Sequence, residues 1–441
     1  MLKKYCKFFG LCALAIMPLC AELSDYEKSL VRTIPAYARL AEDEIASFES
    51  LDAHDYLEQV VCEETIPNAL FQHHPALRGK LSYISLGDLP TEVHHCSSIN
   101  LQFPDVDVYI KHDGTTGRLD NQGNRTFGGN KLRKLQYLLA DAIAHGHDTV
   151  LTFGCVGSNH ALQTAVCARN LNLHCICMLT PQPNAYVVQR NLLLQQVYGA
   201  QLIFAENSLL RAQATIDLCT SCKSENKILP YIIYTGGSVP RGAIGYVEAA
   251  FELKEQILAG LLPEPDHIYV TCGSCGTAAG LLLGCKAAGI STKFHLVLEE
   301  PADVDTVHTR LGTLIRDTND LICSYDSTFP QCTIDENDYE LLAEYGGEGY
   351  GEFTVAGVEA IRAMSHLENI RLDGVYSGKC GSALFADLNS GKLQNTTVLF
   401  WNTFCGADMH TITDQVDYRN LPQALHRWFE EPVQLLDTDP L

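Results

Sequence analysis

Short apolar runs alternate with segments of helical periodicity over much of the chain, from about residue 149 to residue 401. Such runs predict buried strands, and apolar positions repeated every three or four residues predict helices. The expected strands are 149–153, 175–179, 202–204, 231–234, 267–270, 294–298 and 397–401, with helices at 161–170 and 186–198. Strands that alternate with helices predict an α/β fold of mostly parallel, twisted sheets with helices on both faces.

The first 21 residues have a different pattern. Lys3, Lys4 and Lys7 precede an apolar run that ends at Ala21, which is typical of a secretory signal peptide. The alternative interpretation is a buried or anchoring N-terminal helix. Export to the periplasm or the medium would expose the 18 cysteines to an oxidising environment. Without a signal peptide the chain would remain in the cytoplasm, so the sequence leaves both locations open.

Residues 22–81 form an N-terminal extension in this interpretation. The spacing of apolar positions predicts mostly helix over 24–62, with a break at Pro35. Residues 82–441 then form the main region, in which 145–240 is expected to be the smaller of two domains. A chain of 441 residues is long enough for two such domains.

Composition and charge exclude several classes of function. The net charge of −22 argues against nucleic-acid binding and against adsorption to anionic membranes, because both need a basic face. Two Cys-x-x-Cys pairs, at Cys219/Cys222 and Cys272/Cys275, lack a second ligand pair at zinc spacing. We therefore predict no metal site, no nucleic-acid partner, and no membrane partner apart from the N-terminal segment.

Three loops after expected strands carry candidate chemistry, since ligands of parallel sheets bind at the carboxyl ends of the strands. The loop 271–280 is rich in glycine and opens a helix, which predicts a phosphate cradle. The loop 154–160 places Ser158, Asn159 and His160 at another helix start. The third loop, 234–238, is interpreted equally well as a close approach to a ligand or as a flexible turn.

Lys131 stands at the start of an expected helix, after Gly128, Gly129 and Asn130. The positive end of the helix dipole repels an ammonium group, so a lysine here either points to solvent or has its charge used or removed. Burial in such a place lowers a lysine pKa, which suits the amine for Schiff-base chemistry.

These motifs together resemble the pyridoxal-phosphate (PLP) enzymes that include 1-aminocyclopropane-1-carboxylate (ACC) deaminase and D-cysteine desulfhydrase. They belong to fold type II, which is similar to the tryptophan synthase β subunit. The resemblance runs from about Leu86 to Cys405 and rests on the order of Gly-Gly-Asn-Lys, Ser-Asn-His, Gly-Gly-Ser, the loop after residue 271, and 373–379. It implies two domains with PLP in the cleft between them, and a homodimer.

The resemblance also implies roles for particular residues. Lys131 would hold PLP covalently and move protons, the loop would bind the cofactor phosphate, and Ser158 would face the substrate. The implied catalytic residues are Lys131, Ser158, Tyr350 and Tyr376. The implied cofactor-binding residues are Lys131, Asn130, Asn159, Gly273, Ser274, Cys275, Gly276, Thr277 and Ser377.

Several positions depart from the family pattern. Ser377 replaces the glutamate that holds the pyridine nitrogen protonated in ACC deaminase, which favours elimination over opening of the ACC ring. Gly157 replaces a glutamine, Leu162 replaces an arginine, and 113–125 resembles an insertion. We expect a lyase or deaminase that releases ammonia and a 2-oxo acid from a small amino acid. The alternatives are another fold-type II activity, such as a racemase or synthase, and a PLP-binding protein without turnover.

Overall fold

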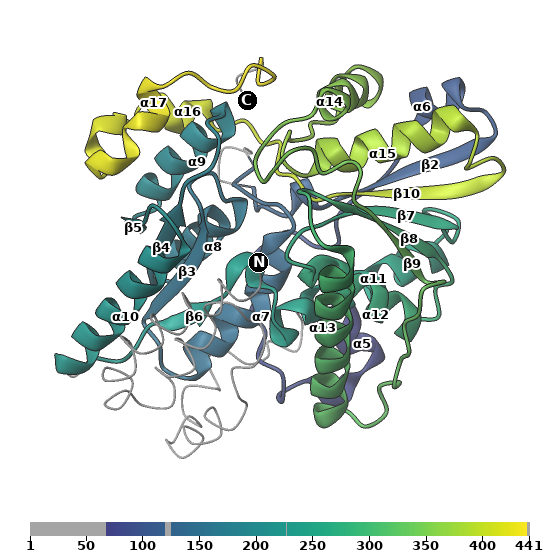
Figure 1. The fold of residues 1–441 in the computed structure, drawn as a ribbon. Coiled ribbons are helices and arrows are strands. Elements are labelled where there is room, and N and C mark those ends of the chain that lie inside the picture. The colour runs from purple at the N-terminus through teal and green to yellow at the C-terminus, as the bar shows by residue number, and fades with distance from the viewer. Residues whose placement is uncertain (1–67, 120–124, 226, 439–441) are drawn as a thin grey trace, which may run out of the picture.

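The computed structural model describes residues 68–119, 125–225 and 227–438, and Figure 1 shows two sheets side by side with helices around both. The signal peptide predicted for 1–21 and the helices predicted for 24–62 lie outside the described residues. Each of the seven expected strands and both expected helices are present, which confirms the α/β fold.

The larger sheet has six strands in the order β1-β2-β10-β7-β8-β9. All neighbouring strands are parallel except β1 and β2. The bounds are β1 (Val93–His95), β2 (Val106–His112), β10 (Thr396–Asn402), β7 (His267–Cys272), β8 (Lys293–Leu298) and β9 (Tyr339–Leu342). The sequence prediction missed β1, β2 and β9, because polar and charged residues interrupt their apolar positions.

The smaller sheet has four parallel strands in the order β5-β4-β3-β6. Their bounds are β5 (Gln201–Phe204), β4 (His174–Thr180), β3 (Thr149–Cys155) and β6 (Tyr231–Ile233). In both sheets the parallel strands end at the same edge as their neighbours, so the loops that follow them gather at that edge.

The helices cover both faces of each sheet. The longer ones are α7 (Lys131–Ala144), α8 (Asn159–Asn170), α9 (Tyr186–Val197), α10 (Ser208–Ser224), α11 (Pro240–Leu258), α12 (Gly276–Ala287), α13 (Val304–Tyr325), α14 (Val355–Glu368) and α15 (Ser377–Ser390). The short ones are α5 (Ala69–His73), α6 (Ser97–Gln102), α16 (His410–Thr413) and α17 (Arg427–Glu430). None of the helices in the described ranges is long and apolar enough to cross a membrane.

Alternating residues of the central strands build two separate cores. Ile268 and Val270 of β7 pack with α11, α12 and α13, whereas Tyr269 between them packs with α14 and α15 on the other face. Helix α11 contacts both α7 and α12. The helix α7, which begins with Lys131, therefore packs against the helices that cover the larger sheet. Figure 1 places α7 between the two sheets.

Candidate active site

The loop after β7 turns sharply into the N-terminus of α12. Cys275 has a left-handed φ of 69° and precedes Gly276, the first residue of the helix. A Cβ on Gly273 would lie 2.2 Å from Glu299 Oε1, and a Cβ on Gly276 would lie 2.5 Å from Ser238 Oγ. Only glycine permits this close packing, in which the Gly276 N–H donates to Ser238 Oγ at 3.1 Å. The positive end of the helix favours an anion beside the loop.

Lys131 is connected to this loop through its neighbour. Its Nζ donates to Asn130 Oδ1 at 2.9 Å, and Asn130 Nδ2 donates to Thr277 Oγ1 at 3.1 Å. Burial lowers the pKa of Lys131 to about 8, although Asp373 and Glu299 raise it. A larger share of the amine is therefore neutral near pH 7 than in an ordinary lysine, which is the form that reacts with a carbonyl.

The third loop, 234–238, forms a wall of the same site. Lys134, one turn after Lys131, donates to the Gly236 carbonyl at 3.0 Å. Ser238 Oγ lies 2.7 Å from Ser274 Oγ. This turn therefore supports the glycine loop. Burial lowers the pKa of Lys134 well below its usual value.

Two tyrosines, Tyr350 and Tyr376, lie near Lys131. Its Nζ is 5.8 Å from the centre of the Tyr376 ring, and the hydroxyl groups of Tyr376 and Tyr350 are 2.6 Å apart. Burial raises the pKa of both tyrosines well above the usual value. Both hydroxyl groups therefore stay protonated at neutral pH and can donate to a neighbouring atom.

Ser158 and Asn159 lie at the start of α8. Ser158 Oγ accepts the N–H of Ala161 at 3.1 Å, and Asn159 Oδ1 accepts from Asn191 at 2.9 Å. Burial, together with the charges of Lys131 and Lys134, lowers the pKa of the next residue, His160, so this helix start is within electrostatic reach of the lysine. In the described parts of the chain neither side chain bonds to Lys131, and the roles of Ser158 and Asn159 stay predictions.

Ser377 is buried and engaged within its own turn. Its Oγ donates to Asp373 Oδ1 at 2.6 Å and accepts the Asp373 N–H at 2.8 Å. Asp373 also accepts the N–H of Ser377 at 2.8 Å, so its carboxylate caps the start of α15. To donate to a ring nitrogen, the Ser377 hydroxyl group would have to give up Asp373 Oδ1, whereas one of its lone pairs is still free to accept. The contact of Ser377 with a cofactor ring stays a prediction.

Two departures from the family pattern have local explanations. Beside Gly157 the space for a side chain is filled by Gln182, whose Nε2 would lie 2.8 Å from an added Cβ. Gln182 Oε1 also accepts the N–H of Gly157 at 3.0 Å. Leu162 is fully buried in an apolar cluster with Phe127, so no charged group points into the site from that position.

Glu299 is a site residue that the sequence interpretation missed. It is 7% exposed, directly follows β8, and its carboxylate packs against the glycine loop at Gly273. Burial raises its pKa to about 7, and its carbonyl accepts from Lys379 Nζ at 2.6 Å. Its position at the carboxyl end of a central strand was the signal that could have identified it.

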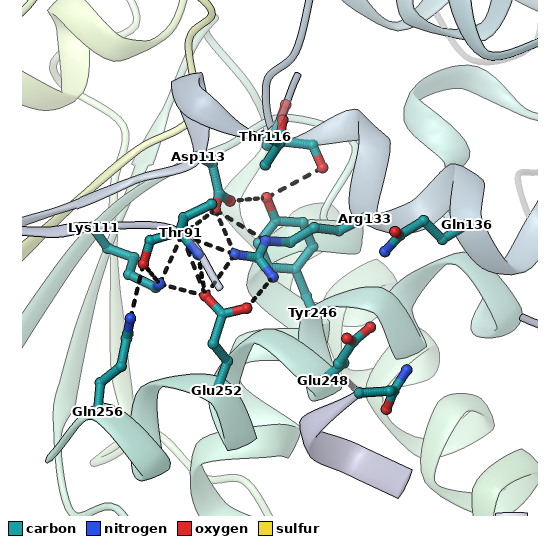
Figure 2. A network of polar contacts seen from close by, with 12 residues as sticks. Thr91, Lys111, Asp113, Thr116, Arg133, Gln136, Tyr246, Glu248, Glu252 and Gln256 are labelled. Atoms are coloured by element: carbon teal, nitrogen blue, oxygen red, sulfur yellow. Dashed lines mark hydrogen bonds and ion pairs between the residues drawn. The ribbon is translucent and has the colours of Figure 1, made fainter. Parts of the chain in front are cut away.

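A buried network of charged residues holds the segment around Lys131 in place (Figure 2). Arg133 donates to Asp113 Oδ1 and to Glu252 Oε2, each at 3.0 Å, and Lys111 forms a second ion pair with Glu252. Tyr246 donates to Asp113 at 2.5 Å and also lies 3.2 Å from the carbonyl oxygen of residue 130. The network therefore fixes the backbone just before the lysine, and Asp113 belongs to the core although it begins the segment that resembles an insertion.

The residues fit a phosphorylated aldehyde such as PLP. The glycine loop carries the hydroxyl groups of Ser274 and Thr277 at the positive end of α12, and the amine of Lys131, with a lowered pKa, is linked to it through Asn130. This combination supplies an anion cradle and a reactive amine, which are the two groups that PLP requires.

We expect Gly276→Ala to weaken PLP binding by about tenfold or more, which corresponds to roughly 1.4 kcal/mol. The added Cβ would meet Ser238 Oγ at 2.5 Å and Lys134 Nζ at 2.8 Å, and would thus disturb the cradle. Titration of the protein with PLP, followed by absorbance, measures the change. Gly312→Ala is the matched control, because a Cβ at this helical glycine meets nothing within 4 Å. Equal affinities of the two variants would contradict this prediction.

The chain is similar to known pyridoxal-phosphate enzymes over most of its length. The family model described as pyridoxal-phosphate dependent enzyme matches residues 84–403. A D-cysteine desulfhydrase of Salmonella typhimurium is 30% identical over 341 residues, covering 75% of this chain and 95% of the relative. That of Salmonella choleraesuis is 32% identical over 307 residues, covering 67% and 86%.

A crystal structure of an ACC deaminase homologue has a TM-score of 0.64 and 29% sequence identity, and the match covers 80% of this chain and 98% of that one. The matched family region contains the lysine, the glycine loop and the tyrosine pair described above. The chain therefore belongs to the pyridoxal-phosphate dependent enzymes, and its relatives place it among their lyases and deaminases.

Proposed function

We propose that this PLP-dependent lyase removes a β-substituent from a small amino acid, with D-cysteine as the first candidate substrate, and releases ammonia and a 2-oxo acid. The observation that carries the proposal is the position of Lys131. Its Nζ donates to Asn130, which in turn donates to Thr277 at the glycine loop, and it lies 5.8 Å from the centre of the Tyr376 ring. The curated relatives named D-cysteine desulfhydrase support the choice of substrate.

The residues can carry the proton transfers of such an elimination. PLP, when bound, draws electrons from the Cα atom of an amino acid and makes its proton acidic. Lys131 can accept that proton at Nζ, because its pKa of about 8 lies close to the working range of a general base. The leaving sulfur needs a proton, and the protonated hydroxyl pair of Tyr350 and Tyr376 can donate it.

The environment of residue 377 supports elimination over opening of the ACC ring. A glutamate at this position would keep the pyridine nitrogen charged, whereas Ser377 offers a hydroxyl group that already donates to Asp373. A less charged ring stabilises a carbanion less strongly, and this suits a substrate with a good β leaving group. D-cysteine has such a group and ACC has none.

A screen of the purified protein against D- and L-cysteine, D- and L-serine and ACC tests the proposal. We expect visible absorbance from bound PLP, and sulfide, ammonia and a 2-oxo acid in equal amounts from D-cysteine. Inversion of configuration without ammonia would instead identify a racemase. A change in the absorbance with every amino acid but no product would identify a binding protein without turnover.

Tyr376→Phe should lower kcat/KM for the preferred substrate by about 10²-fold, as expected when a positioned proton donor is lost. The ring remains next to Lys131, so the PLP absorbance should be retained. Steady-state kinetics across a range of pH measure the effect. Tyr418→Phe is the matched control, since that tyrosine stacks on Phe429 near the C-terminus. An unchanged kcat/KM in Tyr376→Phe would remove this hydroxyl group from the mechanism.

A further inference from the structure

We infer that Cys272 and Cys275 form an oxidation site within the cofactor loop, where Cys275 reacts first with a small peroxide and Cys272 then closes a disulfide. The inference rests on the loop that binds the PLP phosphate and not on the identity of the substrate.

The two sulfur atoms are already close. Cys272 ends β7, Cys275 precedes α12, and their Sγ atoms lie 3.9 Å apart. A disulfide requires a separation of about 2.05 Å, so a modest shift of the loop brings the atoms to bonding distance. Both side chains are 2% exposed, which limits the reaction to oxidants about the size of hydrogen peroxide.

Arg310 of α13 distinguishes Cys275 from the other buried cysteines. Its Nε lies 3.2 Å from Cys275 Sγ, and a second nitrogen donates to the Gly273 carbonyl at 3.0 Å. The contact with Cys272 and the charge of Arg310 lower the pKa of Cys275 to about 7, although burial raises it. In contrast, burial raises the pKa of Cys285, on the same helix α12. The thiolate is the reactive form, so Cys275 should react much faster.

The chemistry balances with hydrogen peroxide as the oxidant. The Cys275 thiolate attacks one peroxide oxygen, the O–O bond breaks, and the released hydroxide takes a proton and leaves as water. Cys272 then attacks the oxidised sulfur as its thiol proton leaves, the S–O bond breaks, and a second water departs. Two thiols and one peroxide thus give one disulfide and two waters.

The cofactor and the oxidation should oppose each other. A phosphate group in the cradle places negative charge near Cys275, which disfavours the thiolate and blocks access to it. A closed disulfide in turn pulls residue 275 toward β7 and displaces the N–H groups at the start of α12. Oxidation of the loop is therefore expected to release PLP, and bound PLP is expected to protect the thiols.

Mass spectrometry after hydrogen peroxide treatment and differential alkylation tests the inference on the full chain, with and without PLP. We expect a disulfide between Cys272 and Cys275 that forms at least about tenfold faster than Cys285 reacts. Its formation should be slower with PLP bound and should lower the PLP absorbance of the desalted protein. A reductant should restore both thiols and PLP binding.

Single substitutions test the separate roles of Cys272, Cys275 and Arg310. Cys272→Ser should leave a sulfenic acid on Cys275 that dimedone traps, and Arg310→Gln should slow the reaction of Cys275. Arg316→Gln is the matched control, because Arg316 lies on the same helix and pairs only with Asp317 in the described structure. The inference is overturned if Cys275 is oxidised no faster than Cys285. It is also overturned if Cys275 is oxidised at the same rate in Arg310→Gln and Arg316→Gln. Loss of turnover in reduced protein would contradict only the proposed function.

Discussion

Lys131→Ala should abolish the visible absorbance of bound PLP and lower kcat/KM by at least about 10³-fold, which corresponds to roughly 4 kcal/mol of transition-state stabilisation. Alanine offers no amine to the aldehyde of the cofactor and no base at the Cα proton. Both functions depend on the same Nζ atom, so the two losses should appear together. Absorbance spectra and initial rates of ammonia release measure them.

Two further variants test whether the amine itself, and this lysine in particular, is required. Lys131→Arg keeps a positive charge at the helix start but cannot condense with an aldehyde, so it should be as inactive as Lys131→Ala. Lys286→Ala removes a lysine that pairs with Asp338 at the surface, and should behave like the wild type. Full activity in Lys131→Ala would contradict both the site and the proposed function.

The fold could be predicted from the sequence where burial on both faces leaves a continuous apolar signal. The central strands β3, β4, β7, β8 and β10 are of this kind, and each was expected within one or two residues. The strand β2 was missed because Lys111, a residue that normally indicates an exposed position, is fully buried in it. The sequence alone does not reveal that Glu252, far along the chain, neutralises this lysine.

The site shows the same limit. The residues near Lys131 in sequence and the glycine loop were identified because the chemistry of each is visible locally. Glu299 was missed although it directly follows an expected strand, because its contact with Gly273 is not visible in the sequence. Arg310 was missed because its importance arises from contacts with Gly273 and Cys275 that only the folded chain creates. Ser377 was identified as a cofactor contact, but its hydrogen bonds to Asp373 could not be anticipated from the motif.

Glu252→Gln should lower the free energy of unfolding by about 3–5 kcal/mol, as is typical when one partner of a buried ion pair is removed. Glu252 is the carboxylate that Arg133 and Lys111 share, and the side chains of both cations are fully buried. Without it, Lys111 keeps only neutral partners at Thr91. Urea unfolding at pH 7 measures the loss.

The double variant Lys111→Met/Glu252→Gln should recover part of this loss, because it removes the stranded ammonium together with its partner. Lys111→Met alone supplies the fourth corner of the thermodynamic cycle. A double variant that is less stable by the full sum of the two single variants would show that the two groups do not interact.

The pH dependence gives an independent check on the same carboxylate. Burial alone would raise the pKa of Glu252, but Arg133 and Lys111 lower it to about 2, from an ordinary value of 4.5. Between these values the unfolded chain binds more protons than the folded one, so stability is lost as the pH falls from about 4.5 toward 2. Glu252→Gln should remove this part of the slope. An unchanged slope between pH 4.5 and the acid limit would show that Glu252 is not the charged partner of Arg133 and Lys111.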